Sequence, residues 1–186
     1  MLMALNFLEA VQTKPIIVTT KQTTHFVNYS ATHPDEITEY RKSGIILHVY
    51  SNASYTSELE ARSRSGGYYF LGQKYNTPIQ EIPLENGPVH VECSITRNVM
   101  ASSTEEDLGG LFEKCQKTTS TRTDLAEMGH QKPPTTVAAE NTASNSIANG
   151  TAKQKRSRAI DIIFLSVQRQ NSTKPFPYIL GGWKKT

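Results

Sequence analysis

The chain has only two cysteines, Cys93 and Cys115, among its 186 residues. Two thiols make neither a disulfide framework nor a metal-ligand pattern, so small disulfide-rich modules and zinc modules are excluded. No apolar run is long enough for a transmembrane helix, and the briefly apolar N-terminus lacks the basic segment that opens a signal peptide. We therefore expect an intracellular protein, cytoplasmic or nuclear, that is not secreted, has no membrane partner and keeps both cysteines as reduced core thiols.

Catalytic and metal-binding motifs are also scarce. The five histidines are scattered without metal-ligand spacing, and the chain has no Ser/His/Asp pattern and no phosphate-binding glycine motif. A net charge of +3 permits a polyanionic partner but does not require one. With 37% hydrophobic and 20% charged residues, the composition suits one folded domain with a modest core rather than a disordered chain.

The apolar pattern that is present predicts an α/β protein with a mixed sheet. Residues 45–50 are apolar on both parities, which is typical of a strand buried on both faces. A polar, glycine-bearing turn at 61–67 would connect this strand to an antiparallel partner. The predicted strands lie at 45–50, 68–71, 89–95, 135–139 and 176–180. The last could only be an edge strand, since its prolines remove hydrogen-bond donors.

The strongest helix signal follows the third predicted strand. Ser103 and Glu106 fit a capping box, and apolar residues then recur at helical spacing, at Leu108, Leu111, Phe112 and Cys115. The β-branched run 118–123 should end or loosen this helix. Further helices are expected in two pieces within 21–43, broken near Pro34 after a lead-in at 1–20, and also at 124–128, at 142–148 and at 160–167.

Polar or acidic residues fall at three junctions of these predicted elements. Asn52 follows the first strand, Asp107 lies in the first turn of the main helix, and Glu140 ends the fourth strand. If the first and fourth strands are parallel neighbours with the helix packed on them, the three side chains can converge at one rim of the sheet. Converging carboxylates suit Mg²⁺, and a pair of such ions can support phosphodiester cleavage. Each residue alone also fits an ordinary role, as a helix N-terminal acid, a turn residue or a strand-end residue.

Six segments together carry a family resemblance. They are 26–35 (FVNYSATHPD), 51–55 (SNASY), 61–67 (ARSRSGG), 98–107 (NVMASSTEED), 140–142 (ENT) and 153–161 (KQKRSRAID). Through them the chain resembles the ribonuclease H domain of copia-type LTR retrotransposon polyproteins, from about Phe26 to about Val167.

The resemblance implies a ribonuclease H-like α/β fold, with an antiparallel meander of the first three strands and a fourth strand parallel to the first. It also implies Mg²⁺-dependent hydrolysis of the RNA strand of RNA–DNA hybrids, with an upstream reverse transcriptase in the parent polyprotein. On this basis 1–43 is a partly helical connection segment, 44–180 is the ribonuclease H-like domain, and 181–186 is a truncated tail.

The chain departs from the family pattern at the site itself. Where the family has Asp, Glu and Asp, this sequence has Asn52, Asp107 and Glu140, and the family's Asn-Leu-Ala-Asp-like stretch with a fourth metal-binding aspartate does not occur before Thr186. We expect these three residues at the catalytic positions, with Asp107 and Glu140 as metal ligands. Glu105 is the alternative to Asp107, which is a question of helix register. Because catalytic geometry tolerates little error, we expect weakened Mg²⁺ binding and weak or absent cleavage.

Basic residues are candidates for contact with nucleic acid. We predict this role for Arg62 and Arg64 in the turn and for Lys155, Arg156 and Arg158 further along, because hybrids are recognised largely through shape and phosphates. The same residues also fit a soluble turn, a solvated linker or a nuclear-localisation-like patch.

Three hypotheses are therefore open from the sequence. The first is a remnant ribonuclease H domain with impaired activity. The second is a non-catalytic nucleic-acid-binding module, whose binding would fall steeply with salt. The third is a pseudogene fragment that folds poorly and would unfold without a cooperative transition.

Overall fold

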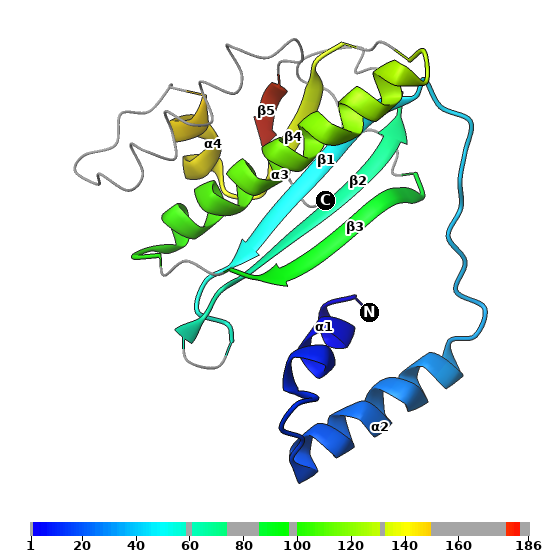
Figure 1. The fold of residues 1–186 in the computed structure, drawn as a ribbon, viewed down its shortest axis with the longest axis vertical. Helices are drawn as coiled ribbons and strands as arrows, with labels where there is room; N and C mark the ends of the chain where they lie inside the picture. Colours follow the sequence, from blue (N-terminus) through cyan, green and yellow to red (C-terminus); the bar gives the residue numbers. More distant parts are fainter. Residues whose placement is uncertain are drawn as a thin grey trace. The chain divides into compact units, whose positions relative to one another are not determined.

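The computed structural model describes residues 2–58, 61–73, 86–96, 100–130, 133–149 and 178–182, the last of these by their backbone. The chain divides into two compact units, Met1–Glu39 and Tyr40–Thr186. The first unit contains two helices, and the second contains a five-stranded sheet with helices (Figure 1).

The N-terminal unit consists of α1 (Leu2–Val11) and α2 (Ile17–Thr32). At the start of α2 the backbone N–H of Ile16 donates to Thr19 Oγ1 at 3.4 Å. The predicted lead-in at 1–20 contains α1 and the first residues of α2.

The segment after α2 is not helical, although a second helical piece was predicted from Pro34 onward. The end of this segment, which belongs to the second unit, forms hydrogen bonds with residues far along the chain. The backbone N–H of Arg41 donates to Asn86 Oδ1 at 2.7 Å. The Tyr40 hydroxyl likewise donates to the carbonyl of Pro88 at 3.0 Å. These contacts with residues more than forty positions away compete with helical hydrogen bonds, and the sequence pattern does not reveal them.

The second unit is built on a sheet with strand order β3-β2-β1-β4-β5. The strands are β1 (Ile46–Ser54), β2 (Arg64–Gly72), β3 (Pro88–Ile95), β4 (Thr135–Ala139) and β5 (Tyr178–Gly182). The first three pair antiparallel, whereas β4 pairs parallel with β1 and β5 parallel with β4. The predicted meander with a parallel fourth strand is therefore confirmed, and β1 is longer than predicted, so that Asn52 lies inside the strand.

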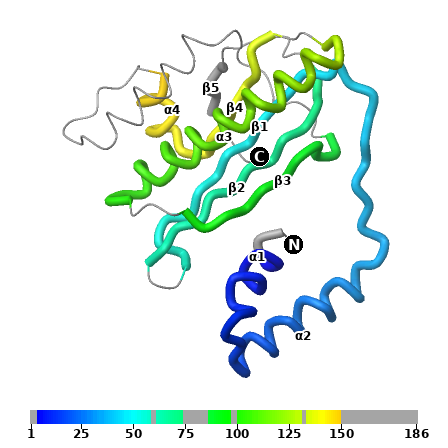
Figure 2. The backbone as a smooth tube through the Cα atoms, in the orientation of Figure 1, coloured from blue at the N-terminus to red at the C-terminus, as the bar shows by residue number. Residues whose placement is uncertain are grey.

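The main core lies between this sheet and α3 (Ser103–Glu127), which runs along β1 (Figure 2). The predicted stripe of α3 is buried there, with Leu108, Leu111 and Cys115 at 0% exposure. They pack with Leu47 and Val49 of β1 and with Val137 of β4. Odd-numbered and even-numbered residues of β1 therefore lie on opposite faces of the sheet, and the odd-numbered residues face α3.

The helix α3 does not end at the threonine-rich run, which corrects the prediction for 118–123 and 124–128. The Thr118 hydroxyl donates to the Lys114 carbonyl at 2.6 Å, so the hydroxyl of this β-branched residue is satisfied within the helix. Arg122 extends from the same stretch to β4, where its Nη1 donates to Thr135 Oγ1 at 2.6 Å. Gly129, with a φ of 86°, ends the helical region.

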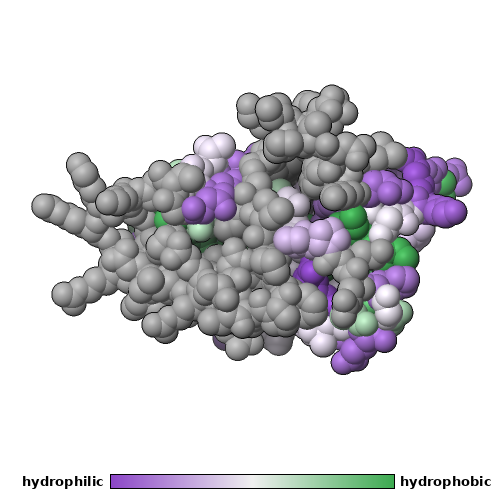
Figure 3. All heavy atoms as spheres, turned by 90° about the horizontal axis from the view of Figure 1, so that it is seen from above, coloured by the Kyte–Doolittle hydropathy of each residue, from purple (hydrophilic) through white to green (hydrophobic). Residues whose placement is uncertain are grey.

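A short helix follows β4, as predicted. The helix α4 (Thr142–Ala148) buries Ser144, Asn145, Ile147 and Ala148, and its last two buried residues join the core beside α3. No helix in the described part of the chain is long and apolar enough to cross a membrane. Hydrophilic residues dominate the described surface in Figure 3, with hydrophobic residues scattered between them.

A buried ion pair joins β3 to α3 on the core side of the sheet. Lys114 is 1% exposed, and its Nζ lies 3.0 Å from Glu92 Oε1, which also accepts a hydrogen bond from the Tyr69 hydroxyl at 2.8 Å. Burial alone would raise the pKa of Glu92, but Lys114, Tyr69 and Lys117 outweigh burial and lower it to about 2. Gly67 leaves room for this cluster, since a Cβ there would lie 3.0 Å from Glu92 Oε1.

We expect Glu92→Gln to lower the free energy of unfolding by about 3 kcal/mol, because it leaves the buried Lys114 charge uncompensated. The stabilisation is fully present above the ordinary carboxyl pKa of 4.5 and is lost as the pH falls toward about 2. Urea unfolding of both proteins across this range measures the difference.

The matched control is Glu113→Gln, because Glu113 is 48% exposed and lies 3.9 Å from Lys114. We expect it to change stability by less than about 1 kcal/mol. Equal effects of the two substitutions at neutral pH would contradict the assignment of Glu92 as the partner of Lys114.

Candidate active site

The acidic residues at the start of α3 have different hydrogen-bond partners. Ser102 is the N-cap: its Oγ accepts from the Glu105 N–H at 3.2 Å, and Glu105 Oε2 accepts from the Ala101 N–H at 2.8 Å. This reciprocal pair is one residue earlier than the capping box predicted at Ser103. Because Glu105 turns back to the cap, the helix register favours Asp107 as the residue at the site.

Glu106, the predicted capping partner, is instead buried at 0% exposure. Thr96 at the end of the third strand donates its hydroxyl to Glu106 Oε1, and Ser63 also hydrogen-bonds this carboxyl group. Burial raises the pKa of Glu106 despite these two bonds. Glu106 therefore ties α3 to the β2–β3 hairpin and does not face the site.

Asp107 and Glu140 are the two predicted acids that the structure brings together. Burial raises the pKa of Asp107, a hydrogen bond from Asn141 opposes this rise, and the nearby charge of Glu140 adds to it. The Asn141 Nδ2 lies 2.6 Å from Asp107 Oδ2. Glu140 is exposed and directly follows the last residue of β4. The two carboxylates thus lie at the carboxyl end of β4, one on a helix and one on the strand end.

Asn52 lies at the same end of the sheet. Ser51 pairs with Ala139 in the parallel register of β1 and β4, so Asn52 and Glu140 are the next residues of the two neighbouring strands. Asn52 is exposed, and by alternation along β1 it belongs to the face opposite α3. No contact joins Asn52 to Asp107 among those described, so the structure places it beside the acidic pair by register alone.

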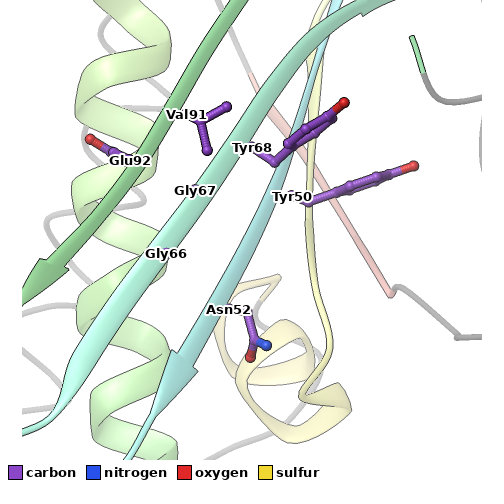
Figure 4. Close-up of a pocket in the computed structure, with 7 residues that line it drawn as sticks. All are labelled: Tyr50, Asn52, Gly66, Gly67, Tyr68, Val91 and Glu92. Atoms are coloured by element: carbon purple, nitrogen blue, oxygen red, sulfur yellow. The ribbon is translucent and has the colours of Figure 1, made fainter. Parts of the chain in front are cut away.

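On that opposite face Asn52 borders a shallow cavity of about 350 Å³. Tyr50 and Tyr68 stand next to it, with ring centroids 6.4 Å apart, and Val91 completes the apolar side (Figure 4). The side chain of Asn52 is the polar group at one end of this lining. The aromatic face gives the candidate site an apolar margin on the side away from α3.

The donor groups fit one divalent cation better than two. No group of three His, Cys, Asp or Glu side chains that could hold a metal ion occurs among the described residues. Asp107 and Glu140 supply two carboxylates, whereas Asn52 is an uncharged neighbour at the same end of the sheet, on the face opposite α3. Mg²⁺ is commonly held by one or two carboxylates together with waters and substrate oxygens. Two divalent ions about 4 Å apart repel each other and need more negative charge than this.

The basic residues predicted to contact nucleic acid have different placements. Arg64 is 3% exposed, and its Nε lies 2.7 Å from Glu58 Oε1, so its guanidinium is part of a buried ion pair. This placement corrects the prediction that Arg64 meets a phosphate backbone, because its guanidinium is buried and its charge is already paired with Glu58. Arg62 is exposed in the turn before β2. Lys155, Arg156 and Arg158 lie outside the described residues.

Sequence reasoning missed Asn141, which lies between Glu140 and the short helix α4. Its Oδ1 accepts from the Ala143 N–H at 2.9 Å, which makes it the N-cap of α4. The available signal was an asparagine immediately before a predicted helix, which is a favoured capping residue. The contact with Asp107 had no signal in the sequence, because it joins residues 34 positions apart.

Comparison with known proteins supports the fold. The sequence matches no protein-family model and no curated protein. Among solved structures, an RNase H1 isolated from compost by a metagenomic approach, LC11-RNase H1, has a TM-score of 0.55 at 8% identity over 76% of this chain and 86% of its own. The same enzyme in complex with an RNA/DNA hybrid has a TM-score of 0.51 at 8% identity, covering 75% of this chain and 86% of the enzyme.

An archaeal enzyme gives the same result. RNase H1 from Halobacterium salinarum NRC-1 has a TM-score of 0.50 at 8% identity over 75% of this chain and 86% of its own. The identities are too low to carry an activity across, but each structural match extends over most of both chains. The second unit of this protein therefore has a ribonuclease H-like α/β fold, as the sequence predicted.

Proposed function

We propose that this chain is a ribonuclease H domain of the copia retrotransposon type, which binds RNA–DNA hybrids and cleaves the RNA strand weakly or not at all. The observation that carries the proposal is the hydrogen bond to Asp107 from Asn141, the residue directly after Glu140 at the carboxyl end of β4, with the uncharged Asn52 at the next register position of β1. Residues 1–43 would then be the connection to an upstream reverse transcriptase.

The proposed chemistry is hydrolysis of a phosphodiester bond assisted by Mg²⁺. Asp107 and Glu140 are the residues that would hold the ion, with Asn52 as an uncharged neighbour at the same end of the sheet. When bound, Mg²⁺ supplies positive charge that activates a water molecule and stabilises the leaving oxygen. The task of the protein residues is to hold the ion at the rim of the sheet and to align the hybrid backbone with it.

We expect impaired cleavage because one negative charge is missing and because two acidic side chains differ in length from those of the family. Under the resemblance, the position of Asn52 belongs to an aspartate, so one negative charge is lost where a cation would bind. Asp107 is one methylene shorter and Glu140 one longer than the acids they replace, which shifts their oxygens by more than catalytic geometry tolerates. Two carboxylates without a third give weak attraction for a single ion and little for a second.

A non-catalytic nucleic-acid-binding module is the second candidate. The specific observation in its favour is that Arg62, a basic residue in the turn before β2, is exposed. The exposed Arg62 would contribute to backbone contact, with Lys155, Arg156 and Arg158 as further candidates. Arg64 drops out of this set because it is bound to Glu58.

Restoring the missing charge tests the proposed activity. We expect the wild-type chain to cleave a labelled RNA–DNA hybrid slowly with Mg²⁺ or Mn²⁺, and Asn52→Asp to raise the rate by about tenfold or more, because it returns a charged ligand. Adding Asp107→Asn to that variant should remove the gain. Asn28→Asp, which adds the same charge on the exposed surface of α2, is the control and should have no effect.

Fast metal-dependent cleavage by the wild-type chain, abolished by Asp107→Asn, would show that the domain is an unimpaired nuclease. The proposal of a ribonuclease H site fails if Asn52→Asp neither gains activity nor binds the hybrid.

Measurements of hybrid binding and stability distinguish the role of the exposed Arg62 from that of the buried Arg64. We expect wild-type affinity to fall steeply with salt, and Arg62→Ala or a triple substitution of Lys155, Arg156 and Arg158 to weaken binding and reduce the salt dependence. Arg64→Ala should instead lower the unfolding temperature, because it leaves Glu58 buried without its partner. Fluorescence anisotropy and thermal unfolding measure the two effects, and salt-insensitive binding would exclude the nucleic-acid-binding role.

A further inference from the structure

We propose that Asn141 is a positioning residue of the candidate site, which holds the carboxylate of Asp107 in a fixed orientation while it caps α4. This inference rests on the proposed function, because it assigns a task toward the proposed metal ligand Asp107. Asn141 does not itself touch the reacting atoms.

Both ends of the Asn141 amide are in use. Its Oδ1 accepts from the N–H groups of Ala143 at 2.9 Å and Ser144 at 3.3 Å. Its Nδ2 donates to Asp107 Oδ2 at 2.6 Å. The opposite orientation of the amide would point an NH₂ group at two N–H donors and an oxygen at a carboxylate. The hydrogen-bond pattern therefore permits a single orientation of the amide.

The segment that carries Asn141 is itself firmly held. Asn145 is 5% exposed, and its Nδ2 donates to the carbonyl of Ala139 at 2.8 Å, which ties the first turn of α4 to the end of β4. Ile147, at 9% exposure, anchors the same helix in the main core beside α3. Asn141 thus stands on a short, packed connection between β4 and α4 rather than on a free loop.

The consequence for Asp107 is geometric. Asn141 donates to its Oδ2 and so restricts the orientation of the carboxylate, while Oδ1 takes no part in this bond and can face a cation. Hydrogen bonds to ligating carboxylates orient them, and their loss typically costs ten- to hundredfold in metal affinity. The same amide therefore couples the folding of α4 to the geometry of the site.

Two substitutions separate positioning from capping. Asn141→Ser keeps a capping oxygen but has no amide to reach Asp107, whereas Asn141→Ala loses both functions. We expect Ser to unfold near the wild-type temperature and Ala to unfold at a lower temperature. Both should bind Mn²⁺ about ten- to hundredfold more weakly than the wild-type chain, measured by electron paramagnetic resonance. If Ser restores metal affinity together with stability, Asn141 has a structural role only and the inference is overturned.

A measurement made without metal tests the contact between Asn141 and Asp107 independently of the proposed function. The side-chain NH₂ of Asn141 should give a shifted, slowly exchanging signal in ¹⁵N–¹H spectra, and Asp107→Ala should abolish that signature. If the signature is present and the wild-type chain binds no Mn²⁺, the contact is real but the metal site, and with it the positioning role, is refuted. If the wild-type chain binds Mn²⁺ and the signature is absent, only the inference about Asn141 fails.

Discussion

The packing of α3 on β1 and β4 is the constraint on which the candidate site depends. Leu108 and Leu111 of α3 are fully buried with Val49 and Val137 of the two strands, and burial of such side chains stabilises the fold by roughly 2 kcal/mol each. This packing sets the start of α3 beside the carboxyl end of β4, where Asp107 lies near Glu140. Two like charges do not gather by their own attraction, so the apolar core supplies the free energy that keeps them together.

Local patterns were sufficient to predict the strands, the start of α3 and the helix α4 in their order, but not α1 or the full length of α3. The two apolar parities of β1 and the stripe from Leu108 to Cys115 follow directly from burial, because period 2 and period 3.6 define which residues face a core. The junction positions of Asp107 and Glu140 could be predicted for the same reason, since they depend only on where strands and helices begin and end, whereas Asn52 lies inside β1. Their assignment to a family site depended on the resemblance.

Features that depend on distant partners could not be predicted. The sequence pattern around Arg64 predicts an exposed turn residue, whereas the fold pairs it with Glu58, and Arg122 in the part of α3 past Thr118 hydrogen-bonds Thr135 of β4. The double hydrogen bonding of Asn141 likewise requires the start of α3 and the end of β4 to meet. In each case a polar side chain gains its role from the tertiary fold, and no periodicity marks it.

We propose that the rim of the sheet would hold one divalent cation through two carboxylates rather than two cations through four. Anomalous scattering from crystals of the full chain grown with an RNA–DNA hybrid and Mn²⁺ tests this most directly. The account predicts one Mn²⁺ ion bound by Asp107 and Glu140, with Asn52 as a neutral neighbour. Two ions bridged at this rim, or an ion that leaves both carboxylates unbound, would contradict it.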